Sequence, residues 1–173
     1  MKRMRTALAA VAVGVAAVLS TAGQAHAAPS ALGSAADEAY YTWRNQLSGK
    51  CLDQNWSGGV NRHTAIAYTC HGDTNQYWQL EWLDTNIYMV RNLGSGECLH
   101  QKYDSSGPTT TVQVVACANV GNQRWRVTAW DDGTYSFKNI ASGWFLDQSY
   151  SGGVERQAVI AYPYHGGANQ FWY

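Results

Sequence analysis

The chain has 173 residues, of which 46% are hydrophobic and 14% charged, and its 12 lysines and arginines balance 12 acidic residues. This length is typical of one domain, and the balanced charge provides no basic surface of the kind that binds nucleic acid or anionic membranes. We therefore expect one domain that neither binds nucleic acid nor inserts into a membrane.

Residues 1–27 have the features of a secretory signal peptide. A basic head precedes a 16-residue apolar run that ends in small residues at Ala25-His26-Ala27. The run is shorter than the roughly 20 residues that a membrane-spanning helix needs. Its removal would leave 146 residues with 9 basic against 12 acidic side chains. Residues 28–39 are small and polar, so we expect a short flexible leader and a secreted, extracellular protein.

From residue 40 onward the sequence repeats itself every 47 positions. The stretch Cys51–Trp78 recurs at 98–125 and 145–172 without an insertion. Such a period indicates units that bury their apolar faces only against one another. The residues common to all three copies are Leu52, Gln54, Asn75, Gln76 and Trp78 in the first, with their counterparts 47 and 94 positions later. The expected repeats are 40–85, 86–132 and 133–173.

Each repeat is expected to contribute four short strands. In the first repeat, β-branched and aromatic residues gather at 41–45, 49–54, 65–70 and 77–82, separated by clusters of Gly, Asn, Asp and Ser. No segment has helical periodicity. The prediction is an all-β domain of about twelve strands, closed into a barrel with a capped end.

The four cysteines are expected to form disulfides, because a secreted protein meets an oxidising environment. Four cysteines allow three pairings. Two possible pairs each span 19 positions and occupy matching places in two repeats, which favours Cys51–Cys70 and Cys98–Cys117. In the third repeat the same places hold Phe145 and Tyr164, where we expect an aromatic contact instead.

Three Gln-x-Trp motifs close the repeats, at Gln76-Tyr77-Trp78, Gln123-Arg124-Trp125 and Gln170-Phe171-Trp172. With the upstream Cys-Leu-Asp and the cysteine spacing, they resemble the ricin B-type β-trefoil lectins over residues 40–173. The resemblance implies a β-trefoil with pseudo-threefold symmetry that binds carbohydrate without a metal or cofactor. It also implies that Trp78, Trp125 and Trp172 are structural core residues.

The resemblance places the sugar contacts at a set of positions that separates the repeats. The first repeat has Asp53, Tyr68, His71, Asn75 and Gln76 at these positions. The third has Asp147, Tyr162, His165, Asn169 and Gln170. The second offers His100, Val115, Ala118 and Asn122, and so lacks the carboxylate, the aromatic ring and the imidazole. We expect pockets in the first and third repeats and a purely structural second repeat.

The chemistry of these side chains fits a sugar. A pyranose has an apolar face that stacks on an aromatic ring and hydroxyls that need a few fixed polar groups. Tyr68 and Tyr162 would supply the rings, and Asp53 and Asp147 would each accept hydrogen bonds from two neighbouring hydroxyls. The alternative is that each Asp caps a turn and each Tyr packs in the core.

Comparison among the repeats favours the binding interpretation. The first and third repeats agree at 16 of 28 positions, whereas the second shares 8 with the first and 7 with the third. All three units have similar folding constraints, so the excess identity indicates a shared task beyond folding. A recent duplication is the alternative explanation.

Two short segments in the first and third repeats indicate the type of sugar. The segments LDQNWSGGV and LDQSYSGGV resemble actinohivin-type mannose-binding lectins, whereas IAYxxHGxxNQxW is closer to ricin-type modules of bacterial xylanases and galactose-directed enzymes. Ile66 and Ile160 stand where that family usually has Gln. We favour a galactose- or xylose-type ligand over mannose.

Catalysis is not expected. The chain contains no GxSxG, HExxH or CxxC motif, and its histidines lack metal-ligand spacing. A glycosidase needs two carboxylates about 5–10 Å apart, but Asp53 and Asp147 belong to different repeats. The remaining alternative is a β-trefoil protein-interaction module, such as a protease inhibitor or the targeting subunit of a toxin or hydrolase complex.

Overall fold

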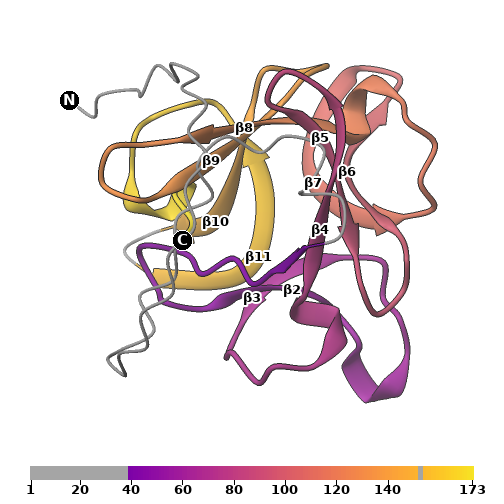
Figure 1. The fold of residues 1–173 in the computed structure, drawn as a ribbon, viewed down its shortest axis with the longest axis vertical. Helices are drawn as coiled ribbons and strands as arrows, with labels where there is room; N and C mark the ends of the chain where they lie inside the picture. Colours follow the sequence, from indigo (N-terminus) through magenta and orange to yellow (C-terminus); the bar gives the residue numbers. More distant parts are fainter. Residues whose placement is uncertain (1–38, 152–153) are drawn as a thin grey trace, which may run out of the picture.

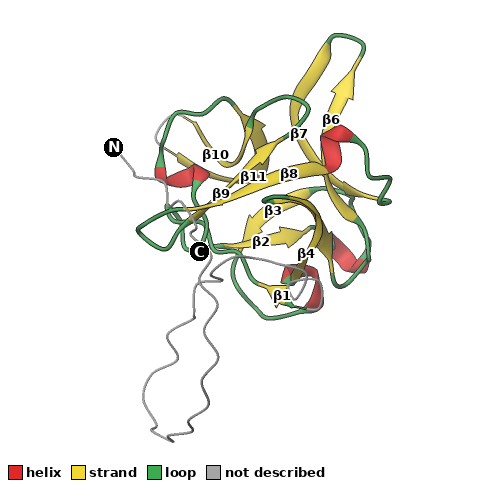
Figure 2. Ribbon diagram, turned by 45° about the horizontal axis from the view of Figure 1, so that its top comes forward, coloured by secondary structure: helices red, strands yellow, loops and turns green. Residues whose placement is uncertain are grey.

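The computed structural model describes residues 39–151 and 154–173, and the predicted signal peptide and residues 28–38 of the leader lie outside them. The described part is all-β, with short 3₁₀ turns only at its periphery (Figures 1 and 2). No helix there is long and apolar enough to cross a membrane. Its strands are β1 Tyr40–Tyr41, β2 Cys51–Gln54, β3 Ala65–Tyr68, β4 Trp78–Asp84, β5 Ile87–Asn92, β6 Cys98–Asp104, β7 Gly107–Val115, β8 Arg124–Ala129, β9 Tyr135–Asn139, β10 Phe145–Ser151 and β11 Val154–Tyr162. The 3₁₀ turns are η2 Ser57–Gly59, η3 Thr74–Gln76, η4 Gly121–Gln123 and η5 Ala168–Gln170.

The strands form where apolar and polar residues alternate. In β4, Trp78 and Leu80 are buried while Gln79, Glu81 and Asp84 are partly or fully exposed. This period of two places one face of the strand in the core and the other in solvent. The first strand was predicted at 41–45, but β1 covers Tyr40–Tyr41, so only Tyr41 of the predicted residues pairs with β4.

Five strands and one bridging residue close a ring, the barrel. The order is β1–β4–β5–β8–β9, and Trp172 then bridges Tyr135 of β9 and Asn45 of the segment after β1. Closure removes the free sheet edges that would otherwise pair with other chains. About twelve strands were expected and eleven are present in the described residues. The place of the remaining strand is taken by the bridge at Trp172.

Three hairpins, β2–β3, β6–β7 and β10–β11, cap the ring. Their second strands meet in a triangle, through the pairs Ala158↔Ile66, Thr111↔Ile160 and Thr64↔Gln113. The three first members, Thr64, Thr111 and Ala158, lie 47 positions apart. Their partners lie 47 positions apart in the same way. The contact of β11 with β3 brings the third repeat against the hairpin of the first (Figure 1).

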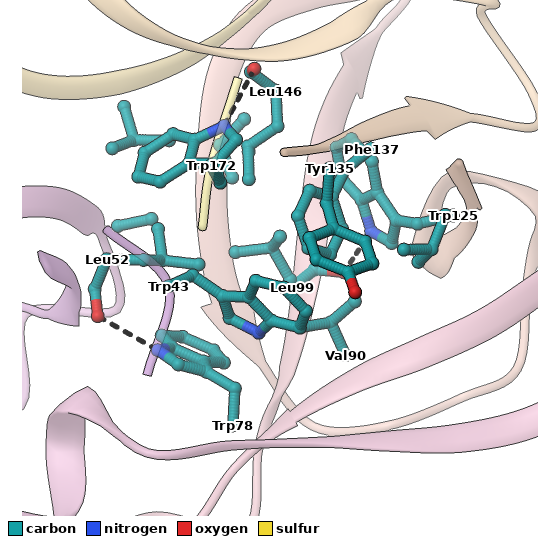
Figure 3. Packing of buried hydrophobic residues seen from close by; sticks show 14 of the residues in the cluster. Trp43, Leu52, Trp78, Val90, Leu99, Trp125, Tyr135, Phe137, Leu146 and Trp172 are labelled. Carbon is teal, nitrogen blue, oxygen red and sulfur yellow. Dashed lines mark hydrogen bonds between the residues drawn. The ribbon is translucent and has the colours of Figure 1, made fainter. Parts of the chain in front are cut away.

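The three motif tryptophans are fully buried in one core. Each indole N–H donates to a main-chain carbonyl 26 residues earlier, so the same bond recurs three times (Figure 3). The pairs are Trp78 to Leu52 at 2.9 Å, Trp125 to Leu99 at 3.0 Å and Trp172 to Leu146 at 3.3 Å. Because the polar atom of each ring is satisfied, the whole side chain is buried without an unpaired donor.

Each repeat has a cross-link at the same place, a disulfide in the first two repeats and an aromatic contact in the third. Disulfides link the two predicted cysteine pairs, Cys51–Cys70 and Cys98–Cys117. In the third repeat the rings of Phe145 and Tyr164 lie 4.8 Å apart in the corresponding place, which confirms the expected aromatic contact.

Buried glutamines also join each hairpin to the next repeat. Each accepts a hydrogen bond from a serine hydroxyl, and the three bonds run around the molecule. They are Ser95 to Gln54 at 2.6 Å, Ser142 to Gln101 at 2.5 Å and Ser48 to Gln148 at 2.5 Å. The glutamines are completely buried, which explains why this residue type stands at the same place in every repeat.

Candidate functional site

The first-repeat cluster is organised around the carboxylate of Asp53, in β2. Its side chain is only 3% exposed. Oδ1 accepts a hydrogen bond from Asn75 Nδ2 at 3.0 Å, and Oδ2 accepts one from Gln76 Nε2 at 2.8 Å. His71 Nε2 lies 3.2 Å from the same Oδ2. All four polar residues predicted for this repeat therefore meet in one network.

Gln76 positions the turn that carries the histidine. It lies in η3, directly before the buried Trp78 strand, and its amide donates to the Thr69 carbonyl at 2.9 Å. Its amide oxygen accepts from the main-chain N–H groups of His71 at 2.9 Å and Gly72 at 3.3 Å. The positive φ of Gly72, 80°, reverses the chain there. The motif glutamine thus holds both the carboxylate and the loop opposite it.

His71 connects the carboxylate to the aromatic ring. Its Nε2 faces Asp53 Oδ2, and its Nδ1 lies 3.3 Å from the Asp73 main-chain nitrogen and 3.1 Å from Asp73 Oδ2, so a carboxylate oxygen lies near each ring nitrogen. The imidazole is edge-on to Tyr68, with centroids 6.1 Å apart. Tyr68 is 43% exposed. The ring therefore faces solvent and does not pack in the core, which argues against the structural alternative for this residue.

The environment of Asp53 limits what it can accept. Burial raises its pKa, and the hydrogen bonds from Gln76, His71 and Asn75 with the charge of His71 partly oppose that rise. A carboxylate has about four acceptor positions, and protein side chains use three of them. About one position remains for a ligand hydroxyl, rather than the two that we expected from the sequence.

A cleft of about 690 Å³ opens over this network. Asp53, Tyr68, His71 and Asn75 form part of its wall, together with residues that the sequence analysis did not select. The additional residues are Asn55, Trp56, Ser57, Gly58, Ile66, Asp73, Thr74, Gly94 and Gln157. The sequence offers one signal for Trp56, because it begins a Trp-Ser-Gly-Gly segment with the residue types of a loop rather than of a buried strand. Gln157 belongs to the third repeat, and no local pattern links it to this cleft.

The third repeat builds the same network. Asp147 Oδ1 accepts from Asn169 Nδ2 at 2.8 Å, and its Oδ2 lies 3.0 Å from His165 Nε2. Gln170 accepts from the His165 main-chain N–H at 3.0 Å. Tyr162 is 46% exposed, and its ring centroid lies 6.0 Å from that of His165. Burial again raises the pKa of the carboxyl, opposed first by His165.

The second repeat keeps the turn without the network. Gln123 accepts from the Ala118 N–H at 2.6 Å and donates to the Ala116 carbonyl at 2.8 Å, as the other motif glutamines do. His100 replaces the aspartate. Its Nε2 lies 3.3 Å from Asn122 Nδ2, its Nδ1 is buried without a hydrogen bond, and burial lowers its pKa. Val115 stands in the place of the tyrosine, so this repeat has neither carboxylate nor stacking ring.

The sequence also matches a family model. Residues 39–172 match the ricin-type beta-trefoil lectin domain. The chain belongs to this family. The resemblance inferred from the Gln-x-Trp motifs is thereby confirmed, and with it the β-trefoil fold. No curated protein matches the chain.

Solved structures agree with the ricin-type assignment. ThreeFoil, a designed 3-fold symmetric protein, is 32% identical, with a TM-score of 0.67 over 77% of this chain and 95% of its own. The Rhizoctonia solani agglutinin is 26% identical, with a TM-score of 0.61 over 77% and 91%. The exo-beta-1,3-galactanase 1,3Gal43A from Clostridium thermocellum is 25% identical, with a TM-score of 0.66 over 79% of this chain but 30% of the enzyme. The ricin-type domain therefore corresponds to a minor part of that enzyme.

Proposed function

We propose that this ricin-type domain is a secreted lectin that binds carbohydrate non-covalently, without metal, cofactor or catalysis, in pockets of the first and third repeats. The observation that carries the proposal is the recurrence of one buried carboxylate, two amides, an imidazole and an exposed tyrosine in two repeats. The second repeat keeps both amides and folds with the same turn, but it has His100, Ala118 and Val115 in place of the carboxylate, the imidazole and the tyrosine. They are therefore not needed for folding, which supports a role in binding.

The polar atoms of the first pocket define what the ligand presents. Asn75 uses its Nδ2 group to donate to Asp53 at 3.0 Å and to the Gln54 carbonyl at 3.1 Å. Its amide oxygen and the remaining position on Asp53 are then both acceptors. Two acceptors side by side suit two hydroxyl donors on neighbouring carbons of a pyranose whose apolar face stacks on Tyr68.

Galactose- and xylose-type sugars are the favoured ligands, and mannose is the less favoured one. All three present neighbouring hydroxyls, so the acceptor pair alone does not choose among them. Ile66 lies in the cleft wall and offers no hydrogen bond at a place where a polar side chain would distinguish one more hydroxyl. The preference follows the resemblance of the IAYxxHG segment described above.

A glycan array on refolded residues 28–173 tests the proposal, followed by calorimetric titration of the best ligand. Asp53→Ala and Asp147→Ala should each weaken binding about 10- to 100-fold at its own site, the cost of a hydrogen bond to a charged group. His100→Ala is the matched control in the second repeat and should leave binding unchanged. If no glycan bound, or if the three variants behaved alike, the protein-interaction alternative would replace this proposal.

A further inference from the structure

The first-repeat cleft is larger than one sugar ring requires. Its volume of about 690 Å³ lies well inside the range of roughly 300–1,000 Å³ that pockets for drug-sized ligands occupy. The network around Asp53 forms only one part of the wall. The rest comes mainly from the loop that follows β2, with further residues from β3, from the turn at Asp73 and Thr74, from Gly94 and from the edge of β11.

A second exposed aromatic ring lies in this wall. Trp56, which precedes η2, is 42% exposed, almost the same fraction as Tyr68 on β3. Two rings from different segments that face one cleft provide two platforms, each suited to the apolar face of one pyranose. An indole that is exposed without packing in the core has no role in folding that would account for its size.

The Trp56 loop is held in place before any ligand arrives. The main chain of Asn55 closes the loop: its carbonyl accepts from the Arg62 N–H at 2.9 Å, and its N–H donates to the Thr64 carbonyl at 2.9 Å. Asn61 Nδ2 donates to Glu97 Oε2, in the second repeat, at 2.9 Å. A loop that is already ordered loses little conformational entropy when it binds.

Gln157 adds a polar group from another repeat. It precedes Ala158, which pairs with Ile66 where β11 meets β3, and its side chain is exposed. The amide carries two donor hydrogens and an acceptor. These complement sugar hydroxyls beside Ile66, where the first repeat itself supplies only an apolar side chain. The cleft is therefore composite: its wall comes mostly from the first repeat, with Gly94 from the second and Gln157 from the third.

The third-repeat pocket has smaller side chains than the first at two corresponding positions. The counterpart of Gln157 there is Thr110, which precedes the Thr111↔Ile160 pair. Threonine is too short to reach as far over the pocket as glutamine does. The counterpart of Trp56 is Tyr150, a smaller ring.

We propose that the first-repeat cleft is an oligosaccharide site, in which one sugar ring stacks on Tyr68 over Asp53 and the next ring contacts Trp56 and Gln157. This inference rests on the proposed function, and names the ligand class of one of its pockets. The first pocket then binds longer sugar chains more tightly, whereas the third binds a single sugar ring.

The test measures the gain in affinity with chain length at the first pocket alone. Tyr162→Ala removes the stacking ring of the third repeat and, being exposed, provides a folded background that near-UV circular dichroism checks. In this background the probes are xylose against xylotriose and galactose against lactose, by calorimetry. In at least one of the two series, the longer sugar should bind at least about tenfold more tightly than its monosaccharide. This is the gain that one added stacking and hydrogen-bonding contact predicts.

Trp56→Ala and Gln157→Ala should each reduce that gain to about threefold or less. The matched controls are Tyr150→Ala and Thr110→Ala, at the corresponding places of the other repeat, and they should keep the full gain. A longer sugar that binds no better than its monosaccharide, or a gain that survives Trp56→Ala, would overturn the oligosaccharide site. If the monosaccharide still bound through Asp53, the lectin proposal would stand. Absence of all binding to the unmutated protein would overturn both.

Discussion

The second repeat shares its folding contacts with the first and third but lacks the polar network that those two have in common. All three make the same indole-to-carbonyl bond, and in all three the motif glutamine binds its turn, for example through Gln123 and Ala118. Only the outer repeats add a buried carboxylate beneath an exposed ring. The carboxylate and the exposed ring are thus separate from the contacts that all three repeats share, and the motif glutamine of the first repeat contacts both its turn and its carboxylate.

The first prediction uses the two pockets together. Pseudo-threefold symmetry would direct them roughly 120° apart, so one short sugar cannot fill both, but branches of a surface glycan can. The second contact then becomes effectively intramolecular, and avidity should exceed single-site affinity by about 10²–10⁴. Retention of wild type, Asp53→Ala, Asp147→Ala and the double variant on immobilised polymer at several densities measures this. Full retention by either single variant at high density would show that its pocket is dispensable.

The second prediction addresses what the repeats share. Trp78→Ala and Trp125→Ala should each lower the free energy of unfolding by about 3–5 kcal/mol, because both remove a fully buried indole. The repeat without a pocket should be as sensitive as the repeat with one. Urea denaturation measures both, with Trp56→Ala as an exposed control that should change stability by about 0.5 kcal/mol or less. A much smaller cost for Trp125 would mean that the second repeat is not an equal part of the core.

The third prediction separates the repeats by their cross-links. Paired Ala substitutions that remove either Cys51–Cys70 or Cys98–Cys117 should lower the free energy of unfolding by about 3 kcal/mol. This is the chain-entropy value for a closed loop of this length. Phe145→Ala removes the corresponding aromatic contact and should leave the response to reductant unchanged. Equilibrium unfolding with and without reductant makes the comparison. Peptide mapping that found Cys51 joined to Cys98 would contradict the pairing.

The fourth prediction attempts to abolish the difference between the repeats. The triple variant His100→Asp, Val115→Tyr and Ala118→His restores the carboxylate, ring and imidazole on a turn that Gln123 already holds. Calorimetric stoichiometry should rise from two sugars per chain toward three. His100→Asp alone is the control, since it buries a charge without the imidazole partner, and should lower stability without adding a site. An unchanged stoichiometry in a folded triple variant would mean that these three side chains do not make a pocket.

The smallest expected effect is a dependence on pH confined to the outer repeats. Burial raises the pKa of Asp53 and Asp147, so their stabilising contribution is fully present below the ordinary Asp pKa of about 3.9 and is lost as pH rises through the raised pKa. Asp53→Asn with Asp147→Asn should flatten the free energy of unfolding across this window. Sugar binding should change in the opposite direction, weakening on acidification through the raised pKa, because the ligand needs the ionised form. Urea denaturation and titrations between about pH 3.5 and 7 test both.

Much of the fold could be predicted, because it follows from the 47-residue repeat and from the spacing of residues within it. The 47-residue register identified the two disulfides, the aromatic substitute at Phe145 and Tyr164, and the tryptophans of the core. Strand positions followed from the alternation of apolar and polar residues. The number of strands was less certain, because the last one is reduced to the bridge at Trp172.

The candidate site could be predicted only in part. The family resemblance selected Asp53, Tyr68, His71 and Asn75, and these do meet around one cleft. It did not reveal that Asp53 is nearly inaccessible and already accepts three hydrogen bonds. Hydrogen-bond saturation depends on where several loops end in space, and the spacing of residues along one repeat does not contain that information.

The sequence by itself determined which positions are equivalent in the three repeats, and hence the family and the disulfide pairing. These follow from local order, because a repeat imposes the same contacts wherever it occurs. Only the tertiary structure decided that Gln157 of the third repeat lies in the cleft of the first. That proximity arises from the packing of β11 against β3, a contact between strands about 90 residues apart, and no pattern within a single repeat encodes it.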